Sequence, residues 1–164
     1  LKAGVEAEAL IHGGGQESGL RSGTQNVAWA VALGVALQTV DNNASQVAAV
    51  TKDFIDAVLA EFPMASLTGA TPDSGSRHPA IASFTFDGIN GETLLLELES
   101  AGVTCSSGSA CAAGSDEPSH VLKALGLAED TCRTAVRFSF GHDASREQAE
   151  QALTALRKAM RRLG

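Results

Sequence analysis

TAVRFSF, Thr134 to Phe140, is the stretch that predicts the fold most clearly. Large apolar residues stand at every second position, from Val136 through Phe138 to Phe140, and this is the period of a β-strand with one apolar face. Arg137 belongs to the opposite face. From the pattern alone, its guanidinium either lies in solvent on an exposed sheet surface or forms a fork that grips a carboxylate.

A second strand is expected from Ala80 to Phe86, because alternate residues from Ala82 onward are apolar. Asp87-Gly88 then turns the chain. We predict that this strand and Thr134–Phe140 lie in one sheet, with helices packed on one face of it. The expected fold class is α/β, more narrowly an α+β small domain with a short mixed sheet.

Helical spacing of apolar residues, together with capping residues and helix breakers, predicts the helices. They are expected over Val27–Val40, Ser45–Phe62, Asn90–Ala101, Pro118–Leu125 and Ser145–Leu163. The expected helix-end residues are Ser22 or Thr24, Ser45 and Asn90 as N-caps, Ser145 with Gln148 as a capping box, Pro118 as an opening residue and Gly126 as a C-terminal glycine.

The first of these helices, Val27–Val40, is apolar almost all round. A helix without a polar face is normally buried on several sides. We therefore expect it to lie between this domain and another body, either a further part of the protein or a second subunit.

A loop dominated by small side chains, VTCSSGSACAAGSDEPSHVL, runs from Val103 to Leu122. Thr104 to Asp116 holds no large apolar residue that would fasten it to a core, so this run is expected to be a surface loop. Cys111 lies in its middle, where accessibility would favour a reactive thiol. Two observations oppose that interpretation: a lone cysteine is often a small buried apolar residue, and the nearby Asp116 and Glu117 disfavour a thiolate.

A glycine-rich segment, HGGGQESGLRSGTQN, runs from His12 to Asn26. Glycines let the backbone approach a ligand closely, and Arg21 with neighbouring hydroxyls before a helix would form an anion cradle. The alternative is a plain glycine-rich connection.

Composition excludes several classes of protein. The chain has 164 residues, 44% of them hydrophobic, and a net charge of −7. These values indicate a globular domain and argue against nucleic acid or a membrane as a partner. Three cysteines without framework spacing indicate a reducing compartment, and we expect a cytoplasmic protein. The first residue is Leu1 rather than methionine, so we expect a piece of a longer protein.

Three stretches resemble the cysteine desulfurases of the NifS/IscS type, which are pyridoxal-phosphate enzymes of the class-V aminotransferase group. They are SSGSAC with the following EPSHVLKALGL, HGGGQESGLRSGTQN, and RFSFG. The resemblance implies that Cys111 accepts sulfur as a persulfide and that Arg137 grips the carboxylate of the substrate cysteine. It also implies that Thr24 helps to hold the cofactor phosphate of the partner subunit. Ser18 and Gln25 depart from the arginine and glutamate usual in the family.

The resemblance implies a division of the chain. Residues 1–26 would end the large cofactor domain, and residues 27–164 would form the C-terminal small domain that carries the cysteine loop. The family's cofactor lysine lies upstream of the HGGG segment, and the chain shows no lysine in that setting, so we expect it to be inactive alone. In the complete enzyme we expect pyridoxal phosphate, L-cysteine, a sulfur-acceptor or scaffold protein, and a homodimer.

Other hypotheses remain open. One alternative is a stand-alone sulfur carrier that receives persulfide on Cys111, although a carrier has no need of Arg137. A selenocysteine lyase is a further alternative. A metal module built from Cys105, Cys111, His120 and Cys132 is disfavoured because the spacing matches no usual zinc pattern, so no metal is expected and Cys105 and Cys132 are interpreted as structural.

Overall fold

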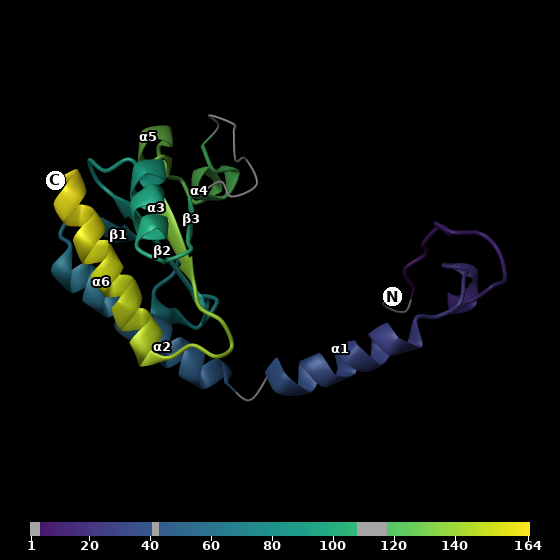
Figure 1. Cartoon of the computed structure of the whole chain (residues 1–164). Coiled ribbons are helices and arrows are strands. Elements are labelled where there is room, and N and C mark those ends of the chain that lie inside the picture. Colours follow the sequence, from purple (N-terminus) through teal and green to yellow (C-terminus); the bar gives the residue numbers. More distant parts are fainter. Residues whose placement is uncertain (1–3, 41–42, 108–117) are drawn as a thin grey trace. The chain divides into compact units, whose positions relative to one another are not determined.

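The computed structural model describes residues 4–40, 43–107 and 118–164 (Figure 1). The chain divides into two compact units, Leu1–Asp41 and Asn42–Gly164. The helix Val27–Val40 falls in the first unit, whereas the sequence resemblance divides the chain at residue 26. The assignment of residues 1–26 to a cofactor domain stays a prediction.

The first unit consists of a glycine-rich segment followed by one long helix. A short 3₁₀ turn, η1 (Glu17–Gly19), precedes α1 (Val27–Val40), and an isolated bridge pairs Ile11 with Arg21. Asn26 caps α1, since its Oδ1 accepts a hydrogen bond from the Trp29 N–H at 3.0 Å. The expectation of Ser22 or Thr24 as the cap is wrong, because the chain stays irregular as far as Asn26.

The helix predicted over Val27–Val40 is confirmed as α1. Its large apolar side chains are exposed within this chain. Trp29 is 73% exposed, and the other large apolar residues of α1 with described side chains are at least half exposed. The expectation that another body covers this helix stays a prediction.

The second unit is built on one four-stranded sheet. Its strands are β1 (Ala65–Leu67), β2 (Ile81–Phe86), β3 (Ser106–Ser107) and β4 (Ala135–Ser139), in the order β1-β2-β4-β3. The two strands predicted from sequence are confirmed as direct neighbours. Every pairing in this sheet is antiparallel, so the expectation of a mixed sheet is corrected. Strand direction depends on how the connections return, which local periodicity does not encode.

Three helices cover one face of the sheet, as predicted. They are α2 (Ala44–Glu61), α3 (Gly91–Ser100) and α6 (Arg146–Leu163), and Figure 1 shows α2 and α6 along the same side of the sheet. The Phe54 ring of α2 lies edge-on to the rings of Phe84, Phe138 and Phe140, with centroids 6.2, 5.0 and 5.3 Å apart. This aromatic cluster forms the centre of the core.

Two short helices, α4 (His120–Ala124) and α5 (Glu129–Cys132), form a second, smaller cluster. Leu122, Cys132 and Ala135 are buried together, with Leu127 packed against them. Ala135 shares its face of β4 with Arg137, so this cluster covers one end of the face opposite the main core. The sequence missed α5, which is only four residues long.

Several predicted helix ends are confirmed. The Asn90 side chain caps α3, and Ser145 and Gln148 form the capping box of α6. Gly126 has a left-handed φ of 85°, and the Leu127 N–H donates to the Leu122 carbonyl, as in a Schellman motif.

Two predicted helix starts are wrong. Ser119, not Pro118, precedes α4, and its hydroxyl accepts from the Leu122 N–H. Helix α2 begins at Ala44, so Ser45 is not its cap. The preceding Asn43 instead donates from its side chain to the His142 carbonyl, a partner 99 residues away that no local pattern reveals. An additional 3₁₀ turn, η2 (Pro72–Ser74), lies in the loop between β1 and β2.

Candidate functional site

Arg137 lies at the centre of the open face of the sheet. It belongs to β4, one of the two inner strands, and its side chain is exposed. Its neighbours Val136 and Phe138 point into the core, at 0% and 3% exposure. The alternation seen in the sequence therefore places the guanidinium on the face away from the aromatic cluster, as predicted.

The residues directly beside Arg137 are both serines. The strand register pairs Arg137 with Ser83 on β2 and with Ser106 on β3. Directly opposed residues on an antiparallel pair have Cβ atoms about 4.5–5.5 Å apart on the same face. Among the described residues, Arg137 forms no ion pair or hydrogen bond through its side chain. The arrangement is an unneutralised guanidinium on a hydroxyl-lined floor, which suits a carboxylate ligand.

Sequence reasoning found Arg137 but missed Ser83 and Ser106 as its neighbours. Alternation along Ala80–Phe86 assigns Ser83 to the face opposite Phe84, so the sequence predicts the face on which Ser83 lies. It does not predict which residue lies opposite Ser83, because register is set by long-range contacts.

The segment that contains Cys111 lies outside the described residues, so the surface loop and the accessible thiol expected there stay predictions. Both of its flanks are described. Ser106 and Ser107 pair with Arg137 and Val136, and after the segment Ser119 is 3% exposed at the start of α4.

The other two cysteines are shielded thiols. Burial, with a smaller effect from Glu99, raises the pKa of Cys105 to about 11. Burial also raises the pKa of Cys132, whose Sγ lies 3.8 Å from the Leu127 carbonyl oxygen. Both remain protonated near neutral pH, which accords with the structural role expected for them.

The glycine-rich segment is braced by its own side chains. The Gln16 Oε1 accepts from the Gly23 N–H at 3.0 Å, and the buried Ser22 hydroxyl accepts from the Gly15 N–H at 3.3 Å. Arg21 Nη1 donates to the carbonyls of Gly23 and Thr24, at 3.1 and 3.5 Å. Arg21 therefore holds the turn itself, while Thr24 stays exposed before α1.

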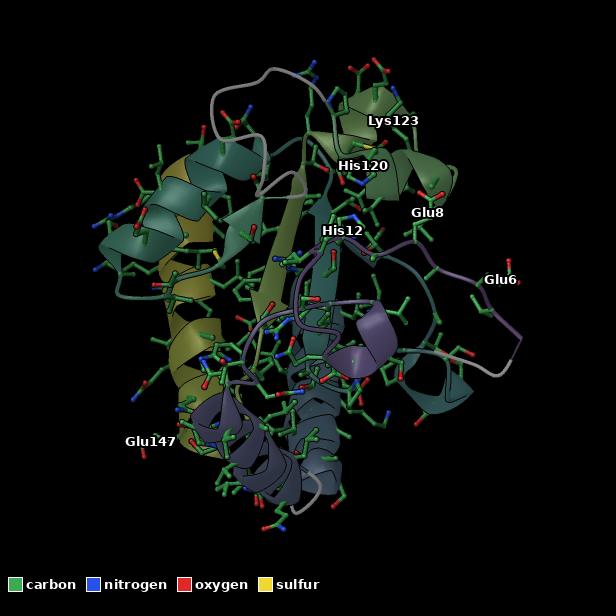
Figure 2. The ribbon with its side chains drawn as sticks, turned by 90° about the vertical axis from the view of Figure 1, so that its right-hand side faces the viewer. Glu6, Glu8, His12, His120, Lys123 and Glu147 are labelled. Carbon is green, nitrogen blue, oxygen red and sulfur yellow. The ribbon has the colours of Figure 1, made fainter. Side chains whose placement is uncertain are left out.

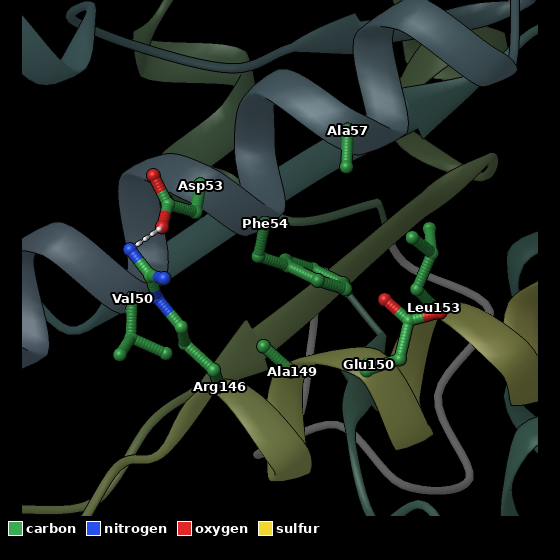
Figure 3. Close-up of a pocket in the computed structure, with 8 residues that line it drawn as sticks. All are labelled: Val50, Asp53, Phe54, Ala57, Arg146, Ala149, Glu150 and Leu153. Carbon is green, nitrogen blue, oxygen red and sulfur yellow. Dashed lines mark ion pairs between the residues drawn. The ribbon is translucent and has the colours of Figure 1, made fainter.

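One hollow of the described surface is lined by none of the predicted site residues. A hollow of about 280 Å³ lies between α2 and α6, with Phe54 at its base and an Asp53–Arg146 ion pair of 3.4 Å at its rim (Figure 3). Within the second unit, Figure 2 shows His120 and Lys123 of α4 at the end opposite Glu147, which lies in the first turn of α6.

The described part of the chain contains neither a cluster of metal ligands nor a membrane-spanning helix. No three histidine, cysteine, aspartate or glutamate side chains converge there as metal ligands. Cys111, a member of the metal hypothesis, lies outside that part. None of the described helices combines the length and apolar character needed to cross a bilayer.

Comparison with known proteins places these features in a family. The model of the class-V aminotransferases matches residues 5–152. An IscS-like cysteine desulfurase of Mycobacterium tuberculosis is 39% identical over 99% of this chain, and the match covers 42% of that relative.

Solved structures agree with this match. A NifS-like protein superposes with a TM-score of 0.78 at 27% identity, over 99% of this chain and 41% of its own. SspA in complex with cysteine matches 83% of the chain at 30% identity, with a TM-score of 0.53. The chain thus spans about two fifths of the relatives it matches. With the fold and most of its length matched, the chain belongs to the class-V aminotransferase family.

Proposed function

We propose that this chain supplies the C-terminal part of a cysteine desulfurase, which converts L-cysteine to L-alanine and a protein-bound persulfide. The observation that carries the proposal is Arg137, exposed and unpaired among the described residues, on the hydroxyl-lined face of the sheet. The desulfurase name of its M. tuberculosis relative supports the same reaction.

Arg137 would bind the α-carboxylate of cysteine. A guanidinium forms two parallel hydrogen bonds with a carboxylate, so it fixes both the position and the orientation of the substrate. The rigid centre of β4 supports this role, because a strand holds its side chains more accurately than a loop does.

Cys111 would accept the sulfur. Its thiolate attacks the sulfur atom of the substrate, the bond between that sulfur and the β-carbon breaks, and the carbon takes up a proton. L-cysteine and the Cys111 thiol thus give L-alanine and a Cys111 persulfide, with no external oxidant or reductant. The raised pKa values of Cys105 and Cys132 support Cys111 as the reactive cysteine.

Pyridoxal phosphate would act as the cofactor of the complete enzyme, where it withdraws electrons from the substrate carbons. This chain fits only its phosphate end, through the exposed hydroxyl of Thr24 beside the braced glycine-rich turn. The described lysines do not fit its covalent attachment. Lys52 and Lys123 lie in surface ion pairs, and Lys158 is exposed on α6. The attachment lysine would therefore come from the rest of the complete protein.

The remaining roles follow from the same proposal. A persulfide is useful only if a second protein takes the sulfur, so the complete enzyme would serve a sulfur acceptor or scaffold for iron–sulfur cluster or thio-cofactor synthesis. We place this enzyme in the cytoplasm as a homodimer in which Thr24 serves the partner's cofactor.

The proposal is tested by locating the persulfide. The complete enzyme is incubated with L-cysteine without an acceptor, the thiols are alkylated, and tryptic peptides are analysed by mass spectrometry. We expect an added sulfur on the Cys111 peptide, its loss in Cys111→Ser and its persistence in the matched Cys105→Ser variant. A persulfide on Cys105 or Cys132, or none at all, would contradict the proposal.

A further inference from the structure

Ser83 is the neighbour of Arg137 whose hydroxyl is available. Both Ser83 and Ser106 lie directly opposite Arg137. The Ser106 hydroxyl donates to the Ser107 carbonyl at 3.1 Å. Ser83 is partly exposed, and within the described residues its hydroxyl has no hydrogen-bond partner. The Ser83 hydroxyl is therefore a free donor, within the described residues, on the residue directly opposite Arg137.

The backbone of Ser83 is held in place from its other side. Its carbonyl accepts two hydrogen bonds from Thr68, from the backbone N–H at 2.9 Å and from Oγ1 at 3.1 Å. Arg77 in turn donates from Nη2 to the Thr68 carbonyl at 2.6 Å. These hydrogen bonds brace the backbone of Ser83 on the side of the strand away from Arg137.

The absence of charge at position 83 matters as much as the hydroxyl. Arg137 is flanked across the strands by serines, and Ser139, two residues along β4, shares its face. A carboxylate at position 83 would form a cross-strand ion pair with Arg137. Such a pair would occupy the guanidinium fork and would also repel a carboxylate ligand.

We propose that Ser83 is a specificity-determining residue of the carboxylate site: it donates a further hydrogen bond to the carboxylate held by Arg137 and, being neutral, forms no cross-strand ion pair with that arginine. The inference rests on the proposed function of Arg137. It limits the ligand at this position to a single carboxylate, as in a small α-amino acid, held by one cation and one hydroxyl.

The test compares two side chains of the same shape and different charge. In the complete enzyme, Ser83→Asp should raise the KM for L-cysteine about ten-fold or more, with kcat changed much less. Ser83→Asn should remain within a few-fold of wild type, and Ser83→Ala should raise KM about two- to ten-fold. The cofactor absorbance and the thermal unfolding midpoint should stay unchanged in all three variants.

Ser66→Asp provides a matched control for charge at a distance. Ser66 is exposed on β1 opposite Thr85, so it shares the face of Arg137 but lies two strands away. This places Ser66 roughly 12 Å from Arg137, farther than the Debye length of about 8 Å at physiological salt. The KM of the Ser66→Asp variant for L-cysteine should therefore equal that of the wild type.

The outcomes separate the inference from the proposed function. If Arg137→Ala raises KM but Ser83→Asp does not, or if Ser66→Asp matches Ser83→Asp, the inference on Ser83 is wrong while the role of Arg137 stands. If Arg137→Ala leaves KM unchanged, the role of Arg137 fails and the inference fails with it.

Discussion

The two faces of the sheet are built from alternate residues of the same strands, yet one face is buried and apolar while the other is polar and partly exposed. On one face, Phe84 and Phe138 are at most 3% exposed and meet the ring of Phe54 under three helices. On the other, Ser83 and Arg137 leave polar groups partly or fully exposed. Alternate residues of one strand thus separate stability from the proposed carboxylate binding, so changes on one face should leave the property of the other intact.

The largest expected effect comes from removing an aromatic ring of the core face. Phe84→Ala should lower the free energy of unfolding by about 3–5 kcal/mol, because it leaves a cavity at a fully buried site. Chemical denaturation monitored by circular dichroism measures this. The adjacent Ser83→Ala, on the open face, is the control and should change stability by less than about 1 kcal/mol. Equal losses would show that the two faces are not independent.

A smaller effect is expected from the open face, and it concerns binding. In the complete enzyme, Arg137→Ala should raise the KM for L-cysteine about ten- to a hundred-fold, since a charge-assisted hydrogen bond contributes about 1.5–3 kcal/mol. Arg137→Lys keeps the charge but not the fork and should recover only part of the loss. Steady-state kinetics and unfolding curves are measured together. A large loss of stability with unchanged KM would reverse the roles assigned to the faces.

A substitution at Gly91, the first residue of α3, measures how closely this helix packs against the strand β4 and the residues before it. An added Cβ there would lie 2.8 Å from the carbonyl oxygens of Arg133 and Ala135. Gly91→Ala should therefore destabilise the chain by about 1–3 kcal/mol, in spite of the better helix propensity of alanine. Gly34→Ala, at a helical glycine with open space around it, is the control. A neutral Gly91→Ala variant would mean that α3 shifts freely over the sheet.

The smallest expected effect has the opposite sign. Thr51 is 2% exposed within the core, and its hydroxyl has no hydrogen-bond partner among the described residues. Thr51→Val should stabilise the chain by about 1 kcal/mol, because it removes a buried unsatisfied polar group. Thr68→Val is the matched control and should destabilise, since the Thr68 hydroxyl donates to the Ser83 carbonyl. Thermal unfolding of both variants distinguishes the two signs.

The sequence by itself determined the features that depend on neighbouring residues. Period-two alternation assigned Arg137 to the face opposite Phe138, and the capping box at Ser145 and the glycine at Gly126 marked helix ends through contacts within a few residues. These predictions hold because backbone geometry and hydrogen bonds between residues close in sequence dictate them.

Only the tertiary structure decided which residues face Arg137. Strand order, the antiparallel directions and the register that sets Ser83 and Ser106 beside it join positions that are distant in the chain. The same holds for Asn43, which bonds to His142 rather than following a local capping pattern. Such pairings arise from the joint packing of the aromatic core and from the path of the connections, and no local period encodes either.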